Sequence, residues 1–165
     1  MFYTYQDIAV KDREESQNYD CILKRGVTVL QLNCRQEPCP DYMKSFKCTI
    51  TGNCGNVFNP TTGHCPQKTT LTRIYDISGD QLTGKRITFS IYFFLGADNV
   101  SDITLTTLST DTADKVVKSL SFENVHMVKG KMTIYKGPFL STHSSASFII
   151  DSPTIPDSGF STEFE

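Results

Sequence analysis

Residues 120–137, LSFENVHMVKGKMTIYKG, decide the fold class because apolar and polar side chains alternate along them. In the first half, Leu120, Phe122 and, after a small irregularity, Val125 fall on one face of an extended chain. The second half repeats the period of two after a basic turn centred on Gly130. Glycine adopts a positive φ at no steric cost, so this turn suits a hairpin. The stretch therefore predicts two strands joined as a β-hairpin whose basic tip faces water.

The same alternation recurs on both sides of this stretch. Further strands are predicted at 2–10, 19–33, 46–52, 69–77, 86–95, 102–108 and 146–151. Gly26 interrupts the second of these, which indicates a bulge or a bend. Residues 109–118 carry a weak helical signal but are interpreted as a loop. Because no segment sustains a helical period, about eight to ten short strands separated by turns predict an all-β sandwich.

The chain has 165 residues, the size of one ordinary domain. Residues 1–151 are predicted to form a single β-sandwich domain. Residues 152–165 contain two prolines and several acidic and hydroxyl side chains, and are predicted to form a polar C-terminal tail. Within this tail, Phe160 and Phe164 are candidate anchors because they face one way if the segment is extended.

Charge and hydropathy exclude two classes of protein. A formal net charge of −2, from 16 basic and 18 acidic residues, argues against a general nucleic-acid binder. The apolar runs are far shorter than the roughly 20 residues of a membrane-spanning helix, so no transmembrane segment is predicted. The chain starts directly in strand-like sequence with no visible signal peptide. It is therefore either cytoplasmic or exported by a segment that lies outside this chain.

All six cysteines fall between residues 21 and 65. They are Cys21, Cys34, Cys39, Cys48, Cys54 and Cys65. Disulfides in an exported chain are the first hypothesis, although six cysteines allow fifteen pairings and the spacing does not select one. Buried, reduced thiols are the second hypothesis, which suits Cys48 on the apolar face of its strand. A zinc site is less favoured, because no C-x2-C pair is present and only His64 stands beside a cysteine.

Sequence signatures of catalysis are missing. The chain has no G-x-S-x-G, H-E-x-x-H or P-loop pattern. The histidines occupy loop-like or strand-end settings; they are His64, His126 and His143. Neither of the two close aspartate pairs has the central glycine and terminal glutamate of a calcium loop. We therefore expect no enzymatic activity, no cofactor and no metal site.

Several of these strands resemble those of a known family. The segments are 122–127 (FENVHM), 133–137 (TIYKG), 23–29 (LKRGVTV) and 57–63 (VFNPTTG). Taken in chain order, they are similar to the strand patterns of fimbrial subunits and fimbrillin-like lipoproteins of the Bacteroidales. The sequence departs from the family at several points. His126 stands where a proline is usual, no asparagine or arginine lies near Gly130, and the usual second basic residue of the early strand is missing at 28–29. The family is also usually poor in cysteine.

The resemblance implies a transthyretin-like β-sandwich in an accessory or anchor subunit of a type V pilus. It implies a non-enzymatic cell-surface protein, exported to the outer membrane, that serves a structural or adhesive role. Such subunits pair β-strands with partner fimbrial subunits, and residues 2–10 and 158–165 are the candidate exchange segments. Alternatively, the chain is a secreted, disulfide-bonded β-domain that binds a glycan or a host protein.

Overall fold

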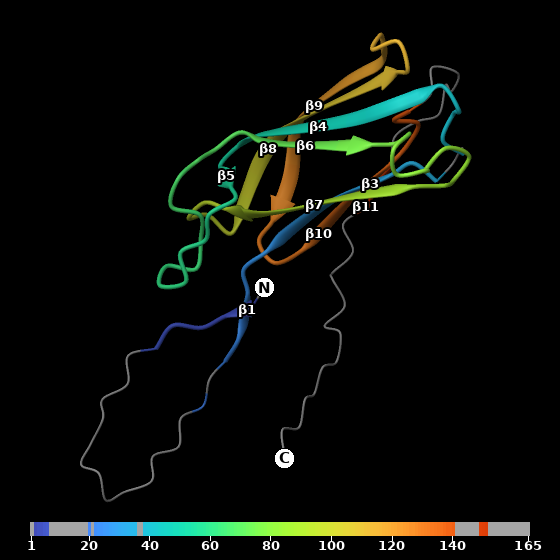
Figure 1. Cartoon of the computed structure of the whole chain (residues 1–165). Helices are drawn as coiled ribbons and strands as arrows, with labels where there is room; N and C mark the ends of the chain where they lie inside the picture. The colour runs from blue at the N-terminus through green and yellow to red at the C-terminus, as the bar shows by residue number, and fades with distance from the viewer. Residues whose placement is uncertain (1, 7–19, 21, 36–37, 141–148, 152–165) are drawn as a thin grey trace, which may run out of the picture.

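The computed structural model describes residues 2–6, 20, 22–35 and 38–140, and the backbone of 149–151. Every regular element within these residues is a strand, and two sheets face each other as a sandwich (Figure 1). The predicted all-β sandwich is therefore confirmed. No helix of the described residues is long and apolar enough to cross a membrane.

One sheet has five strands in the order β11-β10-β3-β7-β5. Their bounds are Thr28–Asn33 for β3, Cys54–Gly55 for β5, Thr88–Leu95 for β7, Met132–Lys136 for β10 and Ile149–Asp151 for β11. Its pairings are antiparallel except that of β10 with β3, which is parallel and aligns Ile134 with Gln31. The sheet therefore joins segments about 100 residues apart in the chain.

The other sheet has four antiparallel strands in the order β6-β4-β8-β9. Their bounds are Met43–Gly52 for β4, Leu71–Asp76 for β6, Val100–Asp111 for β8 and Val116–Val128 for β9. A separate two-stranded ladder pairs β1 (Phe2–Tyr3) with β2 (Lys24–Arg25). Beyond β2, Gly26 separates β2 from β3, so the predicted break in this region is confirmed.

The core lies between the two sheets. On β4, Phe46, Cys48 and Ile50 are 0% exposed, as their alternation predicts. The ring of Phe46 stacks on Phe89 of β7 at 4.5 Å between centroids, and Phe89 lies equally close to Tyr75 of β6 at 4.5 Å. These contacts join both sheets into one apolar cluster, which is the main source of stability for such a fold.

The predicted hairpin of residues 120–137 is wrong in its pairing. Both strands exist, and the chain turns at 129–131, where Lys131 N–H donates to the Val128 carbonyl at 3.0 Å. However, β9 pairs with β8 in one sheet and β10 pairs with β3 in the other. The turn at Gly130 therefore carries the chain between the layers, because each strand finds its partner in a distant segment.

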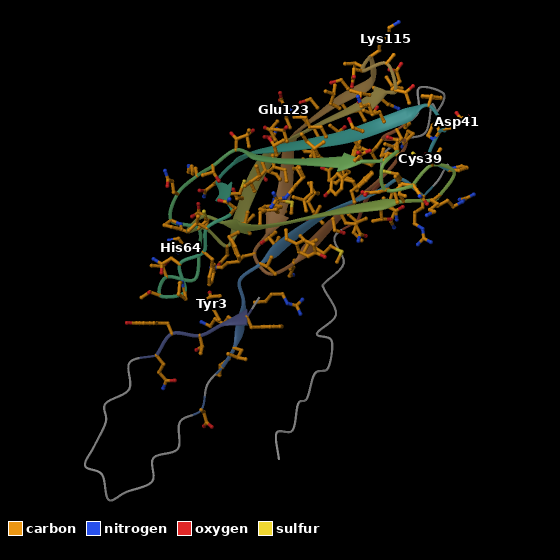
Figure 2. The ribbon with its side chains drawn as sticks, viewed as in Figure 1. Tyr3, Cys39, Asp41, His64, Lys115 and Glu123 are labelled. Carbon is orange, nitrogen blue, oxygen red and sulfur yellow. The ribbon has the colours of Figure 1, made fainter. Side chains whose placement is uncertain are left out.

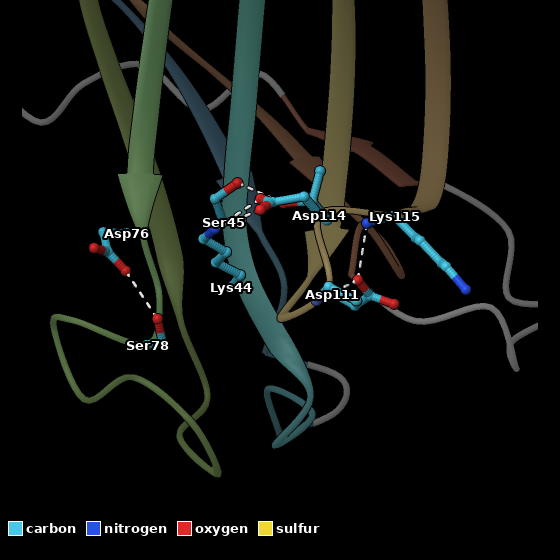
Figure 3. Close-up of polar contacts among 9 residues, drawn as sticks. Lys44, Ser45, Asp76, Ser78, Asp111, Asp114 and Lys115 are labelled. Atoms are coloured by element: carbon cyan, nitrogen blue, oxygen red, sulfur yellow. Dashed lines mark hydrogen bonds and ion pairs between the residues drawn. The ribbon is translucent and has the colours of Figure 1, made fainter.

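The predicted loop at 109–118 is also wrong, since most of it belongs to a β8–β9 hairpin. The Asp111 carboxylate accepts hydrogen bonds from the backbone N–H groups of Ala113 and Lys115, both at 2.9 Å. Lys44 of β4 forms an ion pair with Asp114 at 2.7 Å (Figure 3). Local aspartate–backbone bonding thus produces a tight turn where composition suggested a longer loop.

Candidate functional site

The β6 edge of the four-stranded sheet is regular and has no second partner among the strands that the structure describes. Ile77 N–H donates to the Lys44 carbonyl at 2.9 Å. Backbone groups of alternate residues point to opposite sides of a strand, so those of Thr72 and Ile74 point away from β4. No other described strand pairs with β6 on that side. Its six residues contain no proline, and their register on β4 has no shift.

Side chains of β6 add a mixed surface to this edge. Ile74 is 67% exposed on the outer face of the sheet. Arg73 shares the inner face with Leu71 and Tyr75 by alternation, yet it is also exposed to solvent. The open backbone edge therefore carries an apolar side chain on one face and a positive charge on the other.

The β9 edge of the same sheet is interrupted. Two register shifts occur against β8, one of them where Glu123 and Asn124 oppose a single residue of β8. Asn124 has a φ of 54°, in the left-handed region that few non-glycine residues adopt. The His126 carbonyl is already used, because the Thr133 hydroxyl donates to it at 3.2 Å. These features disfavour the addition of another strand.

The five cysteines of the described region are all free and buried. They are Cys34, Cys39, Cys48, Cys54 and Cys65, while Cys21 lies outside the described residues. The disulfide hypothesis therefore has no support among these five, and their burial is what the buried-thiol hypothesis predicts. The structure gathers them in two neighbourhoods, one with the first three and the other with the last two.

Burial also sets the chemistry of these thiols. It raises the pKa of Cys39 to about 11 and of Cys48 to about 12. The pKa of Cys54 is raised to about 11, first by burial and then by the neighbouring Cys65. Such thiols stay protonated at neutral pH, and the protonated form is a poor nucleophile. Cys39, Cys48 and Cys54 therefore behave as small apolar residues of the core.

The two histidines within the described residues, His64 and His126, make separate local contacts. His126 Nδ1 lies 3.1 Å from an oxygen of Asp102, and both side chains are exposed on the surface. His64 Nδ1 lies 3.1 Å from the Thr62 carbonyl in the loop after β5, and His143 is outside the described residues. Within the described residues, no group of three or more His, Cys, Asp or Glu side chains is placed to hold a metal ion.

The two close aspartate pairs weighed as calcium loops are Asp76 with Asp80 and Asp98 with Asp102, and the first member of each pair makes a local hydrogen bond. Asp76 accepts hydrogen bonds from the backbone N–H of Gly79 at 2.8 Å and from the Ser78 hydroxyl at 3.1 Å (Figure 3). These bonds, the first of them the larger, lower the pKa of the Asp76 carboxyl. Asp98 accepts a long hydrogen bond from the Asn53 amide at 3.4 Å. Both aspartates thus serve the local structure of turns.

A small cavity lies at the end of the sandwich where Tyr3 is found (Figure 2). Its lining comes from four segments of the chain: Tyr3, Lys24, Arg25, Asn99, Val128 and Lys129. The sequence signalled only one part of it, the basic turn at 129–131. The rest could not be found by motif, because these residues meet only after β1, β2 and the ends of β8 and β9 come together.

The proposed exchange segments are only partly described. Phe2 and Tyr3 form β1, whereas residues 7–10 lie outside the described residues. Phe160 and Phe164 lie outside them as well, and so does the rest of the tail.

Comparison of the chain with protein-family models, with curated proteins and with solved structures finds no match.

Proposed function

We propose that this chain is a non-enzymatic, cell-surface subunit of the fimbrial type, with a transthyretin-like sandwich, that assembles by pairing strands with partner subunits. The observation that carries the proposal is the regular, unpartnered edge of β6. Backbone N–H and C=O groups on such an edge can bind an extended segment of another chain by β-strand addition. The resemblance of the strand order to fimbrial subunits supports the same function.

The donor that best fits this edge is the C-terminal tail of a second copy. Alternate residues face opposite sides of a strand, so Phe160 and Phe164 share one face and Glu163 lies on the other. If the donor runs parallel to β6, a register that places Phe164 beside Ile74 also places Glu163 beside Arg73. Apolar contact on one face and charge complementarity on the other would fix this register.

Donation of a tail from one copy to the β6 edge of the next is a heterologous contact. Such contacts form open chains when the rotation between copies does not close a ring. Pro153 and Pro156 lack the N–H that a ladder requires, so pairing is confined to the segment after Asp157. The tail thus divides into a spacer and a donor strand, as a linear fibre would need.

Two variants test the acceptor and the donor separately. Ile74→Pro removes an N–H that points away from β4, so we expect the domain to stay folded while association is lost. Ile74→Thr keeps this N–H and is the matched control. A truncation after Asp151 removes the donor and should also abolish association. Analytical ultracentrifugation measures the assembly, and circular dichroism checks the fold.

Charge reversal tests the register. Arg73→Glu should weaken association, and the double variant with Glu163→Arg should restore it. Lys115→Glu, in the turn between β8 and β9, is the control for net charge. If the truncated protein self-associates and binds partner subunits as well as the full-length protein does, the tail is not the donor. If Ile74→Pro associates as well as Ile74→Thr, β6 is not the acceptor.

A further inference from the structure

The cavity beside Tyr3 is built by a ladder and a turn. In the β1–β2 ladder, Tyr3 stands opposite Lys24, so their side chains share one face. The turn at 129–131 lies against β2, where a Cβ on Gly130 would be 3.1 Å from the Arg25 carbonyl oxygen. Lys129 N–H donates to the Asn99 carbonyl at 2.8 Å, which holds this turn beside the start of β8.

An aromatic wall supports one side of the cavity. The rings of Tyr3 and Phe58 meet edge to face at 4.9 Å between centroids, and Phe58 lies 4.8 Å from Phe94 of β7. Gly63, with a φ of 72°, has no room for a Cβ because the Tyr3 ring occupies that space. Tyr3 is therefore held firmly, although it belongs to a strand of two residues.

The charge of the lining is entirely positive. It contains Lys24, Arg25 and Lys129 and no carboxylate. Neither ion pair of the described residues uses any of the three cations. Arg25 lies over the Phe2 ring at 5.1 Å, and Lys129 lies over the Tyr3 ring at 5.8 Å. These contacts orient the cations, whose charge has no counter-ion among the residues that the structure describes.

Two acidic side chains close to the start of β8 do not supply that counter-ion. Asp98 precedes Asn99 but accepts its hydrogen bond from Asn53. Asp102 pairs with His126 across the β8–β9 ladder. Three cations around a cavity whose lining contains no carboxylate form a site of positive potential that attracts anions.

From this cavity, we infer that the domain binds a compact ligand that carries an oxyanion, with the anion held between Lys24, Arg25 and Lys129. The cavity volume of about 280 Å³ lies at the lower limit for small-molecule sites, which hold roughly 300–1,000 Å³. It suits one acidic sugar residue or an inorganic oxyanion. Tyr3 and Val128 give the apolar surface that the body of a sugar would contact. The inference does not depend on strand pairing at β6.

Titrations of the isotope-labelled full chain, followed by two-dimensional NMR, test this inference at low salt. The probes are methyl glucuronide, the neutral methyl glucoside and inorganic phosphate. We expect the acidic sugar to shift the amide signals of Lys129 and Asn99, and the neutral sugar to have no effect. If phosphate shifts them while the glucuronide does not, the ligand is a free oxyanion, and the anion site is still supported.

Variants then assign the binding to this cavity. Lys24→Gln and Lys129→Gln should each weaken binding by about three- to tenfold, as expected for loss of one charge-assisted contact. Lys115→Gln removes the same charge at a site far from Tyr3 and should leave the affinity unchanged (Figure 2). The amide spectra show whether each variant is folded.

Three results would overturn the inference. The first is that neither acidic probe shifts the Lys129 and Asn99 signals at millimolar concentration. The second is that the glucoside binds as tightly as the glucuronide. The third is that Lys115→Gln weakens binding as much as Lys129→Gln, which would indicate diffuse attraction rather than a site.

Discussion

The two edges of the four-stranded sheet differ in the regularity that strand addition requires. The β6 edge is short and in regular register, whereas the β9 edge contains two register shifts and a residue with positive φ. At β9, the His126 carbonyl also binds the Thr133 hydroxyl of β10. The comparison teaches that one sheet can close one edge by local irregularity and leave the other available.

The difference follows from the connections of the two strands. β9 leads through the turn at 129–131 into β10 of the opposite sheet, so its end must bend across the sandwich. β6 leads into the turn at 76–79 and then to β7. The Tyr75 hydroxyl of β6 donates a hydrogen bond to the Ser90 carbonyl of β7 at 3.2 Å, which joins β6 to the opposite sheet. The outward backbone groups of Thr72 and Ile74 are not needed for that contact and pair with no other described strand, whereas the Asp76 carbonyl accepts a hydrogen bond from the Asp80 N–H at 3.2 Å.

The largest expected effect comes from removing the core beneath β6. Phe46→Ala deletes the ring that joins β4 to Phe89, on which Tyr75 of β6 rests. We expect the free energy of unfolding to fall by about 3–5 kcal/mol, as for other buried aromatic truncations. Val116→Ala, at a position of β9 that is 59% exposed, is the control and should cost less than about 0.5 kcal/mol. Urea denaturation measures both; equal losses would refute this view of the core.

A smaller effect is expected at the irregularity of β9. Asn124→Val places a β-branched residue at a φ of 54° and should destabilise the domain by about 1–2 kcal/mol. Asn124→Gly accepts this φ without strain and should behave nearly as the parent protein. If valine is tolerated as well as glycine in thermal unfolding, the bulge is not a fixed feature of this edge.

The smallest effect concerns the turn that ends β6. The Asp76 carboxyl has a pKa below its ordinary value of 3.8, so its ionised form stabilises the folded state. This contribution is present above pH 3.8 and is lost as the pH falls through the lower pKa of the folded state. Asp76→Ala should therefore lower the melting temperature slightly at neutral pH, and the gap should close in acid. A gap that stays constant between neutral pH and strong acid would show that the carboxylate has no such role.

The strand segments were predictable because alternation is a local property. Phe46, Cys48 and Ile50 face the core as their spacing indicates. The small irregularity noted before Val125 corresponds to one of the two register shifts of β9. The loop predicted at 109–118 failed because the Asp111 carboxylate makes a compact turn from a polar sequence.

The candidate site was less predictable. The basic turn at 129–131 was visible in the sequence, but its neighbours Tyr3 and Lys24 come from the other end of the chain. The open edge of β6 was also hidden, since no local pattern states how many partners a strand has. The buried cysteines were predictable in part. Alternation places Cys48 on the inner face of its strand, but it gives no sign that Cys34 lies close to Cys48 in the folded chain.

The sequence by itself determined which segments are extended and which face of each is apolar, because both depend on neighbouring residues and on the period of the β-strand. Only the tertiary structure decided which strands pair. Residues 120–125 and 132–135 look like a hairpin, yet they belong to opposite sheets, since β10 binds β3 in parallel and β9 binds β8. Pairing depends on burying the apolar faces of all strands at once, and that competition is settled only when the whole chain has folded.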